Sequence, residues 1–171
     1  MRKKLRPLSV NDFYKLSQTI DYQFGSNVSK ILLGDINNIH KLRVYKSPNT
    51  LRIREVYRDN KPIFTIRAED YKILLRIHGA YLLWKNTEEP YYRVTIINDV
   101  AEYIVDGRNV FSRHVLQIDE NRRCGDEVIV VDEEGNLLAV GTLKLSPEEI
   151  LFFTRGEAVR IRETIRDLES E

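Results

Sequence analysis

The sequence predicts an α+β fold in two parts, and three observations support this prediction. Residues 1–89 begin with helix-like segments and continue with strand-like segments. The stretch Glu88-Glu89-Pro90 then interrupts the chain, as a domain boundary does. Residues 90–171 carry five apolar-alternating segments separated by turn residues, which indicates a small β-barrel or closed sandwich. These segments are 93–96, 111–118, 127–131, 137–145 and 158–162.

The first domain is expected to open with two helices. Phe13, Leu16 and Ile20 recur at helical spacing, which predicts an amphipathic helix over 12–22. A side chain that can cap a helix precedes this segment. A second short helix over 26–33 should end at the glycine that follows it, because glycine terminates helices well.

Strands are expected after the two helices. The alternating segments are 41–45, 51–57, 62–67 and 71–77, with a hairpin turn at Asp59-Asn60. Residues 79–84 should form a short helix or turn. The basic residues 1–6 are interpreted as a mobile, solvated arm. Arg52 and Arg54 share a face of their expected strand, where they either extend a basic surface or coat an exposed sheet, and the coat is slightly favoured.

Composition limits the possible classes of protein. The chain has 171 residues, of which 42% are hydrophobic and 31% are charged, so it can bury a core and stay soluble. No apolar run approaches the ~18 residues that a membrane span needs, so we expect no membrane association and a cytoplasmic location. One cysteine excludes an internal disulfide and a thiolate zinc cluster. The formal net charge of +1 means that any binding of nucleic acid must use a local patch.

The turn over residues 106–111 is the most informative stretch of the second domain. Gly107 can take a positive φ and leaves no side chain between the backbone and a ligand. The backbone amides of the turn and the guanidinium of Arg108 are groups that can meet a phosphate. The turn is therefore the first candidate for a binding site.

Basic residues near this turn form a candidate surface. Phe111 and Arg113 are two residues apart in an expected strand, so they should point to the same side. Arg160 and Arg162 should likewise lie together on the outside of the last strand. The candidate basic surface consists of Arg108, Arg113, Lys144, Arg160 and Arg162. Spacing alone supports equally a binding surface and a scattered set of charges that keep the protein soluble.

The second half of the chain resembles a PUA domain, the module named after pseudouridine synthases and archaeosine transglycosylases. Residues 98–111 look like its opening helix and turn, and 125–132, 138–141 and 156–162 are similar to the rest of it, in the same order. The resemblance implies a pseudo-barrel of mixed strands with tRNA or another structured RNA as ligand. The matching contact positions are Gly107, Arg108, Asn109, Val110 and Phe111. Many relatives carry a basic residue just before the turn glycine, whereas this chain has Asp106, which would repel phosphate or orient Arg108.

The first half also resembles a known domain. Residues 21–25, 51–56 and 66–70 are similar to the α+β domain that precedes PUA in archaeal tRNA-guanine transglycosylase, the enzyme that installs the archaeosine precursor in tRNA. The two resemblances cover residues 9–162. They imply a pre-PUA domain over 1–89 and a PUA domain over 90–171.

No catalytic site is expected. The family's catalytic barrel typically needs about 250 residues and has no counterpart here. One cysteine and the scattered His40, His78 and His114 cannot reproduce the family's zinc site, and we expect neither metal nor cofactor. Cys124 lacks a recognisable catalytic base and is interpreted as incidental.

These observations favour a non-catalytic, tRNA-binding protein. The resemblance implies an accessory role in archaeosine-type transglycosylation of tRNA, with a separate catalytic chain as partner. One alternative is a ribosome- or translation-associated PUA protein. Another is a protein–protein adaptor of a modification complex, which should show an exposed apolar patch and little salt-dependent RNA binding.

Overall fold

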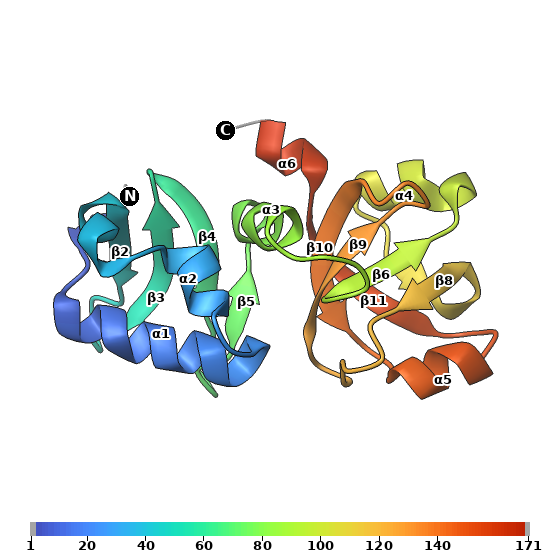
Figure 1. Ribbon diagram of the computed structural model, residues 1–171, viewed down its shortest axis with the longest axis horizontal. Coiled ribbons are helices and arrows are strands. Elements are labelled where there is room, and N and C mark those ends of the chain that lie inside the picture. The colour runs from blue at the N-terminus through green and yellow to red at the C-terminus, as the bar shows by residue number, and fades with distance from the viewer. Residues whose placement is uncertain (1–2, 170–171) are drawn as a thin grey trace. The chain divides into compact units, whose positions relative to one another are not determined.

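The computed structural model describes residues 3–169, which separate into two compact units (Figure 1). The first unit ends at Leu83 and the second begins at Trp84, so the boundary lies within helix α3 (Ile77–Lys85). The sequence-based division after residue 89 lies slightly later and stays a prediction. Each unit has its own sheet and its own buried core, and each is described separately below.

The first unit is an antiparallel sheet with helices on one face (Figure 1). Its strands, in spatial order, are β1 (Arg6–Pro7), β2 (Leu42–Lys46), β3 (Ile53–Arg58), β4 (Lys61–Ile66) and β5 (Ile73–Leu75). Its helices are α1 (Val10–Phe24), α2 (Val28–Leu33), the 3₁₀ helix η1 (Ile36–Lys41) and α3. The expected order of two helices followed by strands and a short helix is therefore confirmed, while η1 was not expected.

Helix α1 forms because its apolar residues lie on one side. Phe13, Leu16 and Ile20 are buried, as their spacing predicts, and Phe24 adds another turn to the apolar stripe. Ser9 caps the helix by accepting a hydrogen bond from the amide of Asp12 at 3.1 Å. Burial of each large apolar side chain contributes about 1.5–3 kcal/mol, so this stripe holds α1 on the sheet.

The N-terminal segment is folded onto the sheet, and the expectation of a mobile arm is wrong for its described part. Arg6 and Pro7 form strand β1, with Arg6 opposite Val44 of β2. Further out, the Lys3 ammonium lies 2.5 Å from a carboxylate oxygen of Glu55. Backbone pairing along the edge of β2 offsets the entropy that an isolated arm would retain. Met1 and Arg2 lie outside the described residues.

The second unit is a curled, mostly antiparallel sheet. Its strands, in spatial order, are β7 (Val110–Phe111), β11 (Glu157–Thr164), β10 (Leu137–Leu143), β9 (Glu127–Val131), β6 (Arg93–Ile96) and β8 (Val115–Ile118). Only β6 and β9 pair in parallel among the described strands. The edge strands β7 and β8 are joined by only three residues, the 3₁₀ helix η3 (Ser112–His114), so the two edges must lie near each other. The sheet is therefore barrel-like, and the α+β fold with a pseudo-barrel in its second half is confirmed.

One expected strand is divided in two. Residues 111–118 do not form a single strand, because β7 ends at Phe111 and η3 turns the chain before β8 begins. The turn is held by Ser112, which is buried and donates its amide hydrogen to the carbonyl of Gly156 at 3.0 Å. Short apolar alternation does not reveal such a corner, because the turn residues here are neither glycine nor proline.

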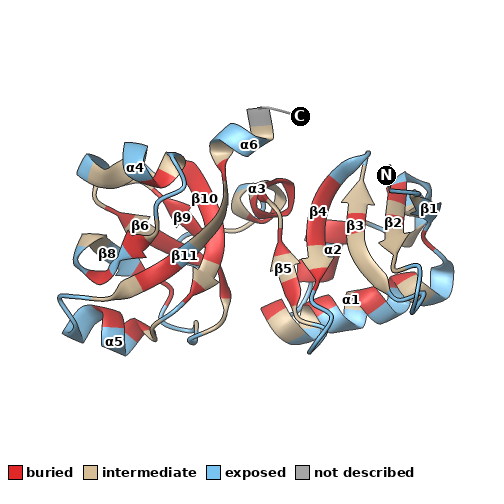
Figure 2. Ribbon diagram, turned by 180° about the vertical axis from the view of Figure 1, so that it is seen from behind, coloured by how far each residue is buried: buried red, intermediate tan, exposed pale blue. Residues whose placement is uncertain are grey.

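Short helices complete the second unit. They are η2 (Asn98–Val100), α4 (Ala101–Val105), α5 (Pro147–Phe152) and α6 (Ile165–Glu169). Helix α5 begins with a capping box in which Ser146 and Glu149 bond reciprocally to each other's backbone amides. Figure 2 shows that buried residues concentrate on the strands, whereas α4, α5 and the connecting loops are largely exposed. No described helix is long and apolar enough to cross a membrane.

Candidate functional site

The turn after α4 presents an open backbone at Gly107. This residue has a φ of +89°, and a Cβ built on it would meet no atom within 4 Å. The amide of Gly107 donates to the carbonyl of Ile104 at 2.9 Å, and that of Arg108 donates to Tyr103 at 3.0 Å. These two amides close the helix end and are not available to a phosphate. The exposed side chain of Arg108 is the donor that the turn offers instead.

Asn109 fastens the turn to strand β11. Its amide nitrogen donates to Glu157 at 3.0 Å, and its carbonyl oxygen accepts a hydrogen bond from the amide of Ile161 at 3.0 Å. Glu157 also accepts a hydrogen bond from the Nε of Arg160 at 2.8 Å and lies opposite Phe111 in the strand pairing. The side chains of Asn109 and Arg160 are thus brought together around the Glu157 carboxylate.

The two residues of β7 differ in what they can contact. Val110 is fully buried in the core of the second unit, so its side chain cannot reach a ligand. Phe111 is 46% exposed, and its ring is open to solvent beside the turn. An exposed aromatic ring of this kind can stack on nucleic-acid bases.

Arg162 has a structural partner. Its guanidinium donates to both carboxylate oxygens of Glu127, at 2.5 and 2.9 Å, and to the hydroxyl of Thr142 at 2.8 Å. The Glu127 side chain is fully buried, whereas that of Arg162 is 25% exposed. A buried carboxylate requires such a bidentate cation, so Arg162 is committed to the fold.

Asp106, the residue that departs from the family pattern, also has a partner. Its carboxylate pairs with Arg166 of α6. A second guanidinium nitrogen of Arg166 lies 3.7 Å from a carboxylate oxygen of Glu102. Asp106 was expected either to repel phosphate or to orient Arg108. Its pairing with Arg166 neutralises the carboxylate and does not involve Arg108. A hollow of about 330 Å³ beside the turn is lined by Gly107, Arg162 and Arg166, but also by Asp106 and Asp167. Its charges are therefore balanced.

Arg113 and Lys144 are exposed and have no described contact with the side chains of Asn109 or Arg160. Arg113 belongs to η3, so the expectation that it shares a strand with Phe111 is wrong. Its Nε donates to Nε2 of His114 at 2.8 Å, and burial, together with the charge of Arg113, lowers the pKa of His114. Lys144 follows β10 and donates its backbone amide to Ala158 at 2.8 Å. No described contact joins either cation to Gly107.

The expected basic surface is therefore only partly a free surface. Arg108 and Lys144 are exposed cations without an ion pair among the described residues, whereas Arg160 and Arg162 are both paired. Sequence reasoning missed Arg166, which neutralises Asp106, and Glu157, which holds Asn109 in place. No local pattern marks either residue, because each acts on a residue about 50 or more positions away.

Two family models match this chain. Residues 15–90 match the patch-forming domain C2 of tRNA-guanine transglycosylase, and residues 92–165 match the PUA domain. The second half of the chain thus carries a PUA domain. The fold of the second unit and the order of the two matched domains agree with the sequence resemblance to the C2-plus-PUA region of archaeal transglycosylases.

Curated relatives of this chain are archaeal tRNA-guanine(15) transglycosylases. The protein from Methanosphaera stadtmanae is 36% identical over 166 residues, which are 97% of this chain and 24% of the relative. The one from Methanocaldococcus jannaschii is 36% identical over 152 residues, which are 88% of this chain and 22% of the relative. The chain thus spans about a quarter of the length of the relatives that it matches.

Solved structures share the fold over nearly the whole chain. A hypothetical protein from Pyrococcus horikoshii superposes with a TM-score of 0.73 at 24% identity, covering 96% of each chain. A conserved PUA-domain protein from Thermoplasma acidophilum superposes with a TM-score of 0.63 at 20% identity, covering 94% of this chain and 93% of that one. At these identities the likeness concerns the fold alone.

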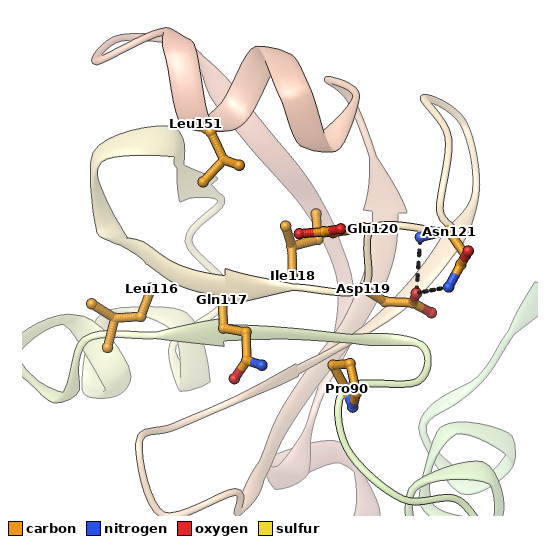
Figure 3. A pocket seen from close by; sticks show the side chains of 8 residues that line it. All are labelled: Pro90, Leu116, Gln117, Ile118, Asp119, Glu120, Asn121 and Leu151. Carbon is orange, nitrogen blue, oxygen red and sulfur yellow. Dashed lines mark hydrogen bonds between the residues drawn. The ribbon is translucent and has the colours of Figure 1, made fainter.

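The PUA domain also carries exposed apolar side chains on β8 and α5. Leu116, Leu151 and Phe152 are 53%, 68% and 84% exposed. The ring of Phe153 packs edge-on against that of Phe152, with 5.7 Å between the two ring centres. We call these four residues the apolar patch. Figure 3 shows Leu151 extending from α5 toward β8 above a hollow of about 290 Å³, with Leu116 further along the strand. A cluster of this kind is typical of a surface that another molecule covers.

Metal-binding chemistry finds no support in the part of the chain that the structure describes. No group of three or more histidine, cysteine or acidic side chains converges there. His40, His78 and His114 lie on η1, α3 and η3. The exposed Cys124 donates its thiol hydrogen to the carbonyl of Lys144 at 3.1 Å.

Proposed function

We propose that this protein binds tRNA and acts as an accessory in tRNA modification, while a separate chain carries out the transglycosylation. The observation that carries the proposal is the open turn at Gly107, flanked by the exposed Arg108 and Phe111, within a matched PUA domain. The relatives with the same two domains are named as enzymes that act on tRNA. The matched region is about a quarter of those enzymes, and we assign the chemistry to a polypeptide other than this region.

The turn suggests how an RNA end would be held. The missing side chain of Gly107 lets the RNA backbone approach closely, and Arg108 supplies a charge-assisted bond to a phosphate. The ring of Phe111 offers a platform for an unpaired base, as found at single-stranded RNA ends. Asn109 holds this arrangement in place through β11 rather than by touching the ligand. The remaining predicted contacts, Arg113, Lys144 and Arg160, would meet phosphates further along the RNA.

Affinity for tRNA at several salt concentrations tests the proposal. We expect salt-sensitive binding that weakens when the unpaired 3′ end is trimmed. The double variant R108A/F111A should bind about tenfold more weakly, which corresponds to one lost phosphate contact and one lost stacking contact. The variant R123A removes another exposed arginine from the same domain and serves as the control.

The results of these binding measurements distinguish a wrong contact site from a wrong function. Equal affinities for R108A/F111A and R123A would remove the proposed contact site while leaving RNA binding intact. Absence of binding even at low salt would overturn the function itself. Salt-sensitive binding that ignores trimming would place the contact on a different part of the RNA.

A second candidate function is protein docking, and the apolar patch is the observation that favours it. An adaptor would use Leu151 and Phe152 to contact another chain of a modification complex. Docking and RNA binding use different residues in this reading and are compatible. No feature of the described residues specifically favours the ribosome-associated alternative.

A further inference from the structure

Two adjoining hollows in the first unit have cations as most of their charged lining residues. One, of about 450 Å³, is formed where the N-terminal segment crosses the edge of β2, and the other, of about 380 Å³, lies against α1. The two hollows share Lys46 and Leu51 in their walls. Their basic lining residues are Lys3, Lys4, Arg6, Lys15, Lys46 and Arg52, and we call this set the basic hollows.

Positive charge dominates these walls. Asp12 is the single acidic residue among the residues that line the two hollows, and Glu55 lies nearby as the partner of Lys3. Six cations therefore face two carboxylates in a chain whose formal net charge is only +1. The contrast with the balanced hollow beside Gly107 is clear, since that hollow has two cations and two carboxylates. Of these hollows, the two in the first unit therefore carry the larger excess of positive charge.

The paired cations are held in position. Lys46 bonds to Asp12 at 2.9 Å, and Lys3 bonds to Glu55. The hydrogen bond from Lys46 lowers the pKa of Asp12. Burial alone would raise the pKa of Glu55, but hydrogen bonds from Lys3 and Tyr57 lower it. Both carboxylates therefore stay ionised at neutral pH, and they fix their partners at the walls of the hollows.

Other cations remain available to a ligand. Lys4 and Arg6 are exposed and have no ion pair among the residues described here. Arg52 is also exposed and lies over the ring of Tyr71, with its guanidinium carbon 5.2 Å from the ring centre. The aromatic contact limits the rotamers of Arg52, so less entropy is lost when it binds. Lys4, Arg6 and Arg52 are the groups that an incoming anion would meet.

We propose that the basic hollows bind consecutive phosphates of an RNA backbone, as a second contact in addition to the turn at Gly107. This inference rests on the proposed RNA-binding function and assigns part of it to the first unit. A polyanion with regularly spaced charges fits adjoining hollows that share a basic wall. The serine hydroxyl at Ser47, which lines the first hollow, adds a neutral donor of the kind that phosphates accept.

The test compares two charge-matched variants of the whole chain. K4Q/R6Q removes two unpaired cations of the basic hollows, and K30Q/K61Q removes two exposed lysines that line neither hollow. We expect K4Q/R6Q to bind tRNA about five- to tenfold more weakly at ~0.15 M salt. Its slope of log affinity against log salt should fall by about 1.5 to 2, because two phosphate contacts are lost. K30Q/K61Q should change affinity less than about twofold, since it lowers only the overall charge.

Each outcome bears on one proposal. If wild type binds tRNA and K4Q/R6Q binds as K30Q/K61Q does, the basic hollows do not contact RNA and the turn site stands. If K4Q/R6Q keeps its affinity for tRNA but binds an acidic partner chain more weakly than K30Q/K61Q does, the hollows bind protein and not RNA. If wild type does not bind tRNA at low salt, the proposed function falls and this inference falls with it. Equal melting temperatures of the two variants show that folding does not explain a difference, since Lys4 and Arg6 have no described ion pair to lose.

Discussion

Arg162→Ala distinguishes a residue of the fold from a residue of the binding surface. Glu127 is fully buried, and Arg162 is the cation that meets both of its carboxylate oxygens. Truncating the arginine leaves a buried carboxylate without that partner, which typically costs ~3–5 kcal/mol. We expect about 3 kcal/mol, at the lower end, because a quarter of the Arg162 side chain is exposed and water can reach the site.

Thermal unfolding followed by circular dichroism measures this cost. A loss of about 3 kcal/mol in a unit of this size lowers the melting temperature by on the order of 10–20 °C. Arg160→Ala is the matched control, since Arg160 lies on the same strand and its side chain is 61% exposed. That change should cost no more than about 1 kcal/mol.

A compensating variant isolates the buried charge as the cause. Glu127→Gln combined with Arg162→Ala removes the uncompensated carboxylate while keeping a group that can bond to Thr142. The double variant should therefore be more stable than Arg162→Ala alone, with a coupling of more than ~1 kcal/mol. If Arg162→Ala melts as Arg160→Ala does but loses affinity for tRNA, the structural role argued here is refuted and Arg162 belongs to the ligand-contacting surface.

Two further predictions concern the turn and the corner that follows it. Gly107→Ala should destabilise the chain by about 1 kcal/mol, because a φ of +89° strains an L-residue, while packing should stay intact because no atom lies within 4 Å of the added Cβ. Urea unfolding measures this cost, and a loss above ~3 kcal/mol would contradict the open geometry. The lowered pKa of His114 predicts stability that is fully present above its ordinary pKa of about 6.5 and declines as the pH falls through the lower pKa of the folded state. His114→Gln, which can still accept from Arg113, should flatten that decline in urea unfolding measured between pH 7 and pH 5; an unchanged pH profile would show that another group titrates.

The two-part α+β organisation and most of the helices and strands are predictable from the sequence alone. Helix α1 is evident from the spacing of Phe13, Leu16 and Ile20, because helical periodicity places these residues on one face whatever they pack against. Strand β6 is found at the expected residues, 93–96, for the corresponding reason. The position of the turn glycine was also readable, since a positive φ is a local requirement.

Which charged side chains are left without an ion pair depends on tertiary contacts that local sequence patterns do not show. Glu127 and Arg162 are 35 positions apart, and Asp106 and Arg166 are 60 apart, so their pairing depends on strand register and on where α6 returns. Periodicity tells which side of a strand a residue faces, but not which opposite charge lies on the neighbouring strand. The same limit concealed the basic hollows, because Lys4 and Lys46 share a wall only once β1 pairs with β2. Local patterns therefore predict elements, whereas the electrostatics of a surface arise from contacts between residues distant in sequence.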